Sequence, residues 1–325
     1  MTTAAAEDQK PSTTGGIRPI LLGIVGDSAT GKTTLTNGIV RIFGSDRVTS
    51  LCTDDYHRYD REERKKRDIT PLHPDCNYID IMEQHLDHLV HGNPILKPVY
   101  GHEHGTLDAP ELIEPRDIVV VEGLLGYHTK VMRDCFDVTV YLDPPEELRR
   151  RWKIQRDTSK RNYTPEQVLA DLDRREPDSE AFIRPQREWA DIVVQFYPEN
   201  DSYDDFDSAK LNVRLVLRPT LAHPYLKELD ERTQIDGLKP IQLSLERDSD
   251  RPVDALTVSG QVPPKASAEV ERLIWEGMAL EDAELDRDAI GVFQEGDQVR
   301  RSESLALTQL MLVAQLVSAR TDAAP

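Results

Sequence analysis

A glycine-rich stretch near the start of the chain has the residue types and spacing of a phosphate-binding loop. The sequence "GDSATGKT" at 26–33 fits G-x-x-x-x-G-K-[ST], follows a short apolar run and opens a segment with helical periodicity. Backbone N–H groups of such a loop surround phosphate oxygens, Lys32 can reach the outer phosphates, and the Thr33 hydroxyl can hold Mg²⁺. The sequence therefore predicts a nucleoside triphosphate site. Its predicted residues are Gly26, Asp27, Ser28, Ala29, Thr30, Gly31, Lys32, Thr33 and Thr34.

A second metal-binding acid is expected at the end of a neighbouring strand. The apolar run at 118–121 ends in Glu122 and Gly123. Carboxylates at strand ends hold the metal in sites of this kind. Glu122 is therefore predicted to share Mg²⁺ with Thr33.

The stretch "CTDDYHRYDR" at 52–61 concentrates groups that could act on an acceptor molecule. Phosphoryl transfer to a hydroxyl needs a carboxylate that orients the hydroxyl and accepts its proton. Asp54 and Asp55 follow a predicted strand, at the edge where parallel sheets bind ligands. Because neighbouring residues of an extended chain point in opposite directions, we expect only one of the two to face the acceptor. The spacing leaves open which one.

Two basic clusters, at 58–67 and 149–161, contrast with the acidic chain. We interpret 64–67 and 149–151 as solvated helix faces. Lys153, Arg156 and Asp157 have helical spacing that places them on one face, and Arg161 follows near the predicted helix end. Such a helix could cover the phosphates as a lid that excludes water and stabilises charge in phosphoryl transfer.

Composition narrows the class of protein. The net charge of −19 argues against general nucleic-acid binding, which depends on neutralising many phosphates with Lys and Arg. The three cysteines have no metal-type spacing, which favours a reducing, cytoplasmic location. The apolar runs are shorter than the roughly 18–20 residues that span a bilayer, so we expect no membrane association.

Apolar runs alternate with amphipathic segments from residue 17 to about 198. Strands are predicted at 17–26, 47–52, 116–123 and 137–143, and helices at 32–44, 78–92 and 145–161. This alternation predicts an α/β fold of the P-loop NTPase type, with a mostly parallel sheet flanked by helices.

The C-terminal part has a different pattern. Alternating polar and apolar residues at 211–219, 241–247 and 254–260 predict antiparallel strands, and helices are expected at 267–278 and 303–319. The last helix is apolar enough to pack against a core or a partner subunit. We therefore divide the chain into a disordered tail at 1–16, a kinase core at 17–198, and an antiparallel extension of the same domain at 199–325.

Taken together and in order, five motifs resemble phosphoribulokinase. They are "GDSATGKTT", "CTDDYHRYDR", "KPVYGHEHGTLDAPELI", "VVVEGL" and "WKIQRDTSKR". The resemblance is strong from about Ile20 to Tyr197 and weaker towards the C-terminus. It implies transfer of the γ-phosphate of MgATP to the 1-hydroxyl of ribulose 5-phosphate, which gives the ribulose 1,5-bisphosphate used in carbon fixation by the Calvin cycle.

The resemblance also implies roles for individual residues. Asp54 corresponds to the general base, and His57 and Arg61 to substrate-binding residues. Asp157 corresponds to a second essential acid, as a metal ligand or a carboxylate on the nucleotide side. The basic lid residues of the family correspond to Lys153, Arg156 and Arg161, and Tyr100 and His102 lie in a segment similar to one near the sugar phosphate.

The cysteines depart from the plant and cyanobacterial branch, which the pattern otherwise resembles most. That branch has a redox-switch pair, with one cysteine in the phosphate loop and one just before the Asp-Asp pair. Cys52 stands at the second place, but Thr30 occupies the first, and no cysteine follows Cys135. We therefore expect no thiol–disulfide switch of that type.

Two alternatives remain beside this interpretation. A uridine-kinase-like enzyme would share the fold but needs aromatic stacking for a neutral nucleoside, whereas a sugar phosphate needs Arg and Lys. A regulatory protein without transfer activity would have no use for an acceptor-directed base. A small sugar phosphate is thus the expected ligand partner, and a homodimer is the expected assembly.

Overall fold

In the computed structural model, the described residues are 18–160, 163–200, 203, 206–223, 226–235, 237–278 and 285–322. The predicted tail at 1–16 and the predicted lid residue Arg161 lie outside them. No helix in these ranges combines the length and the apolar character that crossing a membrane requires.

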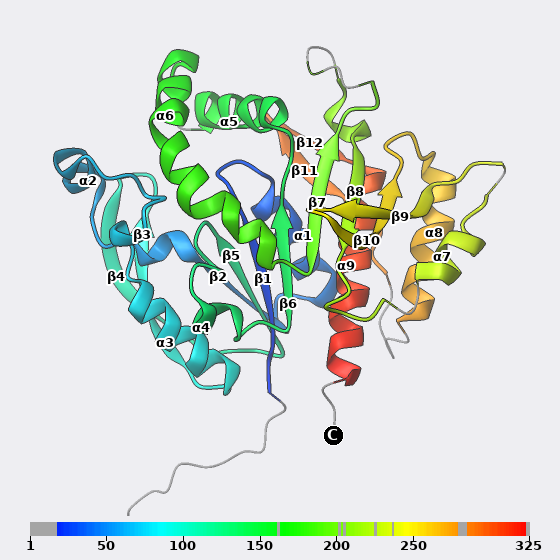
Figure 1. Ribbon diagram of the computed structural model, residues 1–325, viewed down its shortest axis with the longest axis horizontal. Coiled ribbons are helices and arrows are strands. Elements are labelled where there is room, and N and C mark those ends of the chain that lie inside the picture. The colour runs from blue at the N-terminus through cyan, green and yellow to red at the C-terminus, as the bar shows by residue number, and fades with distance from the viewer. Residues whose placement is uncertain are drawn as a thin grey trace, which may run out of the picture.

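An eight-stranded sheet forms the centre of the molecule, in the order β2-β5-β1-β6-β7-β8-β10-β9 (Figure 1). The first five strands pair in parallel, and β8, β10 and β9 continue the same sheet in antiparallel pairs. The strands are β1 Ile20–Gly26, β2 Val48–Cys52, β5 Ile118–Gly123, β6 Val138–Leu142, β7 Ile192–Tyr197, β8 Asn212–Leu217, β9 Ile241–Asp248 and β10 Arg251–Val258. The predicted fold class, a mostly parallel sheet with an antiparallel extension, is confirmed.

Helices cover both faces of this sheet (Figure 1). They are α1 Lys32–Phe43, α2 Arg61–Arg67, α3 Ile79–Val90, α4 Lys130–Arg133, α5 Glu146–Lys160, α6 Pro165–Asp178, α7 Leu226–Arg232, α8 Pro264–Gly277 and α9 Glu303–Asp322. Side chains alternate along β1: Leu22 joins a core with α1 and α9, and Leu21 joins a separate core with α3. The α9 helix is therefore buried within its own chain, where it packs against α1 and α8.

Two hairpins lie outside the central sheet and were not predicted. The first consists of β3 Ile95–Gly101 and β4 Thr106–Ile113, and the second of β11 Val292–Glu295 and β12 Gln298–Arg301. The helix α6 and the strand β7 were also missed, as were the short helices α4 and α7. A capping box between Thr164 and Gln167 starts α6, a signal that the sequence contains.

Candidate active site

A cleft of about 1020 Å³ opens at the carboxyl ends of the parallel strands. Its walls come from the β1–α1 loop, the turn after β2, the end of β5, and the helices α5 and α6, with the β11–β12 hairpin at one end. Of the described site residues predicted from the sequence, all but Gly26 and Asp27 line it. Gly26 is the last residue of β1, and Asp27 begins the β1–α1 loop.

The β1–α1 loop has the backbone shape of a phosphate cradle. Gly31 has φ +95°, a left-handed conformation that favours glycine, and α1 begins at the next residue. Nζ of Lys32 donates hydrogen bonds to the carbonyl oxygens of Gly26 at 2.9 Å and Asp27 at 2.7 Å. Burial lowers the pKa of this amine, while the nearby Asp54 carboxylate favours its charged form. The loop therefore lines the cleft together with the cation of Lys32.

A buried ion pair fixes the loop to α5. The Asp27 carboxylate accepts hydrogen bonds from the backbone N of Ser28 at 2.6 Å and from the hydroxyl of Ser179. Nη1 of Arg149 lies 3.4 Å from the same carboxylate, and the arginine is only 4 % exposed. The prediction of a solvated face at 149–151 is therefore wrong for Arg149, because this residue pairs with the phosphate loop.

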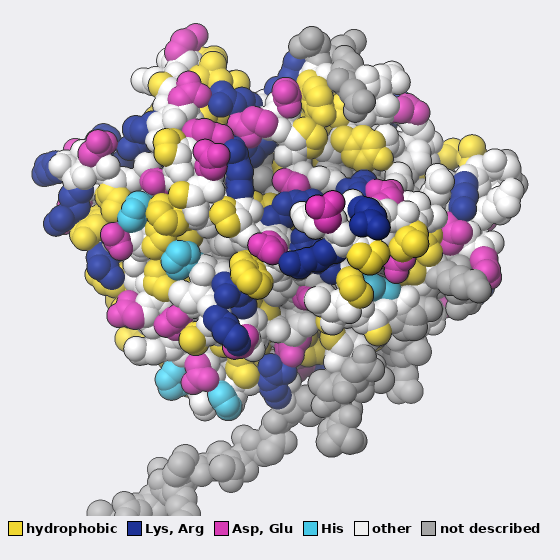
Figure 2. All heavy atoms as spheres, in the orientation of Figure 1, with side chains coloured by type: hydrophobic (Ala, Val, Ile, Leu, Met, Phe, Trp, Pro, Cys, Tyr) yellow, Lys and Arg dark blue, Asp and Glu magenta, His cyan; other side chains and the backbone are white. Residues whose placement is uncertain are grey.

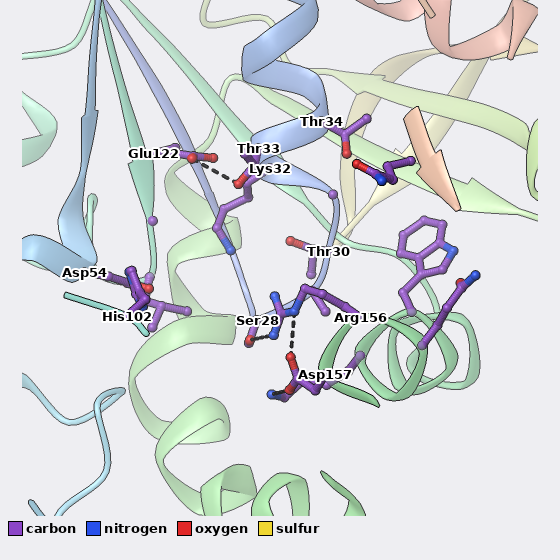
Figure 3. A pocket seen from close by; sticks show the side chains of 18 of the residues that line it. Ser28, Thr30, Lys32, Thr33, Thr34, Asp54, His102, Glu122, Arg156 and Asp157 are labelled. Atoms are coloured by element: carbon purple, nitrogen blue, oxygen red, sulfur yellow. Dashed lines mark hydrogen bonds and ion pairs between the residues drawn. The ribbon is translucent and has the colours of Figure 1, made fainter. Parts of the chain in front are cut away.

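Thr33 and Glu122, the two residues predicted to share Mg²⁺, meet above the loop (Figure 3). The Thr33 hydroxyl donates to Oε1 of Glu122 at 3.1 Å, and the Thr36 hydroxyl lies 3.5 Å from Oε2. Burial raises the pKa of Glu122, and Lys32 opposes that rise. Mg²⁺ is held in proteins by one or two carboxylates together with substrate phosphates and water, so an oxygen-only pair suits it.

Asp54 and Asp55 lie in a single 3₁₀ turn, Thr53–Tyr56, rather than on an extended chain. The Asp55 carboxylate accepts from Nζ of Lys97 and from the backbone N of Tyr100 at 3.0 Å, which fastens the β3–β4 hairpin to the turn. Among the described residues, no side chain forms a hydrogen bond or ion pair with the Asp54 carboxylate. Local partners therefore distinguish two carboxylates that the spacing could not separate.

His57 is 3 % exposed and oriented by Asn77. The Asn77 amide nitrogen donates to the carbonyl oxygens of Pro71 at 3.1 Å and His73 at 2.9 Å, so its oxygen faces Nδ1 of His57 at 2.7 Å. This arrangement places the imidazole proton on Nδ1 and leaves Nε2 as the acceptor. Burial lowers the pKa of His57, which favours the neutral ring.

The predicted residues Arg61, Tyr100 and His102 form one group with Arg64. Nη2 of Arg61 donates to the carbonyl oxygen of His102 at 2.6 Å, and the Tyr100 ring packs edge-on against both His57 and His102. Arg64 donates to the Tyr100 hydroxyl and lies 4.8 Å from the centre of its ring. The interpretation of Arg64 as a solvated residue is therefore wrong. Figure 2 shows Lys and Arg side chains gathered around α2, at the left edge of the molecule.

Lys153, Arg156 and Asp157 share one face of α5, as their spacing predicted. Oδ2 of Asp157 accepts from Nζ of Lys153 at 2.6 Å, and Oδ1 accepts from Nε of Arg156 at 2.8 Å. Arg156 also reaches Oγ of Ser28 at 3.4 Å (Figure 3). Burial, followed by Arg175, lowers the pKa of Lys153 to about 8. Burial alone would raise the pKa of Asp157, but Arg156 and Lys153 outweigh it and hold that pKa at about 2.

This pairing separates Asp157 from the predicted metal ligands. Both of its oxygens face cations of α5, whereas Thr33 and Glu122 pair with each other. Figure 3 shows Glu122 with Thr33 on one side of Lys32 and Asp157 on the other. The structure therefore brings together two of the three predicted metal ligands.

The three cysteines are free thiols. Burial raises the pKa of Cys52, and the carboxylates of Asp54 and Glu122 raise it further. Burial also raises the pKa values of Cys76 and Cys135 to about 11. All three are therefore held in the protonated, weakly nucleophilic form.

Some residues of the cleft carried no recognisable signal in the sequence. Arg64 lies within a basic run in which nothing distinguishes one residue from the next, and the β11–β12 hairpin is distant from the motifs. Asn77, which orients His57 from outside the lining, is also outside the motifs. Trp152 belongs to the "WKIQRDTSKR" motif, but only the packing of α5 brings it to the cleft.

Comparison with known proteins gives a consistent family. The model of the "Phosphoribulokinase / Uridine kinase family" matches residues 21–202, more than half of the chain. The phosphoribulokinase of Synechocystis sp. is 43% identical over 199 residues, which cover 61% of this chain and 60% of that protein. The chloroplastic phosphoribulokinase of Arabidopsis thaliana is 37% identical over 216 residues, covering 61% of this chain and 55% of that protein. The chain thus spans less than two thirds of the length of these relatives.

A uridine kinase and a solved structure are also similar. The uridine kinase of Clostridium tetani is 31% identical over 183 residues, which cover 54% of this chain and 87% of that protein. The structure of a phosphoribulokinase from Rhodobacter spheroides superposes with a TM-score of 0.57 at 18% identity, covering 80% of this chain and 97% of that one. At that identity, the superposition supports the fold alone.

Proposed function

The chain belongs to the phosphoribulokinase/uridine kinase family, and on that premise we propose that it is an ATP-dependent kinase acting on ribulose 5-phosphate. The product would be ribulose 1,5-bisphosphate. One observation carries the proposal: a single cleft contains both a phosphate loop and, facing it, a carboxylate beside a group of basic side chains.

The nucleotide end of the cleft suits the triphosphate of ATP. The loop amides and Lys32 would hold the phosphates, and Thr33 with Glu122 would hold Mg²⁺. When bound, Mg²⁺ would neutralise part of the charge on the phosphates. The ion pairs of Asp157 favour its assignment as a positioning residue for Lys153 and Arg156 rather than as a third metal ligand.

The acceptor end suits a hydroxyl on a phosphorylated sugar. Asp54 would accept the proton of the attacking hydroxyl, because no side chain among the described residues forms a hydrogen bond or ion pair with its carboxylate. Arg61 and Arg64 would attract the sugar phosphate. His57, with its proton on Nδ1, would offer Nε2 to a sugar hydroxyl.

The helix α5 would stabilise the charge of the transferring group. Lys153 and Arg156 extend from it into the cleft, and Arg156 already contacts the phosphate loop at Ser28. Cations placed on a transferring phosphoryl group are among the largest contributions to this type of catalysis.

The same cleft favours a sugar phosphate over a nucleoside. Arg61, Arg64 and Lys65 line the acceptor end, and cations of this kind suit a phosphate group better than a neutral base. The uridine kinase relatives make a nucleoside the competing acceptor.

An ADP-release assay with three acceptors tests the proposal. Ribulose 5-phosphate should support turnover, whereas ribulose, which lacks only the phosphate, and uridine should support little. If turnover with ribulose equals that with ribulose 5-phosphate, Arg61 and Arg64 do not bind a substrate phosphate. Faster turnover with uridine would reassign the enzyme as a nucleoside kinase.

A further inference from the structure

The cleft has two chemically different ends. The end at Asp54 is basic, whereas the end beyond the phosphate loop, here called the apolar end, carries the apolar side chains of Trp152, Phe196, Phe293, Val299 and Leu305. In Figure 3, Asp54 and Thr34 lie on opposite sides of the Lys32 side chain. A nucleotide with its phosphates on the loop and its terminal phosphate towards Asp54 would therefore direct its base to the apolar end.

The aromatic side chains at this end come from two separate parts of the chain. Trp152 is on α5, and its ring packs edge-on against Phe196 of β7 with 5.9 Å between ring centres. Phe293 is on β11, which packs against α1, the helix that follows the phosphate loop. Trp152 and Phe293 are both only partly buried, so their rings retain surface that faces the cleft.

Ion pairs and hydrogen bonds hold the β11–β12 hairpin in place. Arg300 pairs with Asp207 at 2.5 Å and with Glu295 across the hairpin. Oγ of Ser208 donates to the Glu295 carboxylate at 2.5 Å. Arg41 of α1 reaches the carbonyl oxygen of Ala289 at 3.4 Å, just before the hairpin. These contacts hold the hairpin in one position at the edge of the cleft, as a specific binding site requires.

We propose that Trp152 and the β11–β12 hairpin form the nucleobase subsite of this cleft, with Phe293 as the principal contact of the hairpin. This inference rests on the proposed use of a nucleoside triphosphate. Aromatic faces suit a base because every nucleobase has a flat π surface that stacks on them. The amide side chains of Asn37, Gln155 and Gln294 line the same end and could pair with the polar edge of the base.

The hairpin lies at 292–301, beyond the residues 21–202 that the family model matches. The part of the chain outside that match would therefore contribute directly to substrate binding. The less specific explanation is that Trp152 and Phe293 only complete the hydrophobic core. That explanation predicts a loss of stability on truncation but no selective effect on nucleotide binding.

Calorimetric titration with two ligands separates these possibilities. Wild-type protein and the variants Trp152→Ala and Phe293→Ala are titrated with the Mg²⁺ complexes of a non-hydrolysable ATP analogue and of inorganic tripolyphosphate. Each substitution should weaken binding of the analogue about ten-fold, the size of one lost base–aromatic stack, and leave tripolyphosphate binding unchanged. Trp189→Ala is the matched control, since Trp189 is 52% exposed and does not line the cleft.

Unchanged affinity of both variants for the ATP analogue would overturn the inference, as would equal weakening of both ligands. Should Phe293→Ala unfold, Phe293→Leu keeps the apolar volume without the ring and should still weaken only the analogue. The proposed function would fail in a different way. A wild-type protein that binds the analogue more tightly than tripolyphosphate but transfers no phosphate would support the nucleobase subsite and contradict the kinase activity.

Discussion

The Asp54–Asp55 pair shows how identical neighbouring side chains acquire different roles from their partners. Asp55 belongs to a nearly buried ion pair with Lys97 that joins the β3–β4 hairpin to the turn after β2. Asp54 lines the cleft beside Lys32, whose charged form it favours. At the scale of single residues, the arrangement assigns chemistry to the first aspartate and structure to the second.

Substitution of each aspartate tests this division. Asp54→Asn should lower kcat by ~10²–10⁴-fold, the usual range for a lost proton acceptor, with little change in affinity for an ATP analogue. Asp55→Asn is the matched control, and it should lower the free energy of unfolding by about 3 kcal/mol because Lys97 would remain buried without its partner. Steady-state kinetics measures the loss of kcat in Asp54→Asn, and thermal unfolding measures the loss of stability in Asp55→Asn. Full activity of Asp54→Asn would mean that another group accepts the proton.

The pKa of Lys153 predicts a pH dependence. The pKa of its amine is lowered from 10.5 to about 8 in the folded chain, so the amine is mostly charged below that pH and mostly neutral above it. If this charge stabilises the transferring group, kcat/KM for ATP should fall as the pH rises through about 8, because kcat/KM reports the groups of the free enzyme. Lys153→Arg, which stays charged throughout, should move the fall to higher pH. If kcat/KM of Lys153→Arg falls at the same pH as that of the wild type, the fall belongs to the titration of another group.

Cys52 is expected to have no regulatory role. Its raised pKa keeps the thiol protonated, and Thr30 stands where the resemblance places a partner cysteine. Activity should therefore be equal after incubation with a dithiol reductant or with an oxidised dithiol, and Cys52→Ser should behave like the wild type. Reversible inactivation by oxidant that Cys52→Ser abolishes would contradict this expectation.

At the scale of elements, the contact between α1 and α9 links the phosphate loop to the C-terminal part of the chain. Gln309 of α9 is fully buried, donates to the carbonyl oxygen of Thr34 at 3.2 Å and accepts from the backbone N of Gly291 at 2.8 Å. Its amide packs directly over Gly38, where a Cβ atom would overlap it. One glutamine thus connects α1, α9 and the segment before the β11–β12 hairpin.

Gly38→Ala should therefore lower the free energy of unfolding by about 1–3 kcal/mol, the usual cost of overpacking a core. Gly277→Ala is the matched control, because no atom lies within 4 Å of an added Cβ and a helix gains from losing glycine. Chemical denaturation measures both. Equal stability of Gly38→Ala and the wild type would mean that Gln309 can move away without loss.

The elements also show what sequence patterns can and cannot predict. The central strands other than β7 were predicted from their apolar or alternating runs, and α1, α3, α5, α8 and α9 from helical periodicity, from a residue that starts or ends the helix, or from a long apolar run. The β3–β4 hairpin was missed because β4 is mostly exposed and has little apolar alternation. Arg149 was misjudged because its burial depends on Asp27, which lies 122 positions earlier in the chain.

At the scale of the whole molecule, the antiparallel strands β8, β10 and β9 extend the same sheet that carries the phosphate loop.

The division of the chain at residue 198 and the homodimer stay predictions. Size-exclusion chromatography with light scattering would give twice the chain mass for a homodimer. Sequence motifs mark the residues that the phosphate loop, the Asp54 turn and α5 bring to the cleft, but the apolar end of the cleft depends on bringing α5 and the β11–β12 hairpin together.

The central claim is that this cleft transfers phosphate to a sugar phosphate. The most direct measurement is a competition in which ribulose 5-phosphate and uridine, at equal concentration, share one reaction with γ-labelled ATP. The account predicts that the label appears in ribulose 1,5-bisphosphate, with little in uridine monophosphate. Label predominantly in uridine monophosphate, or in neither product while the protein still binds ATP, would contradict it.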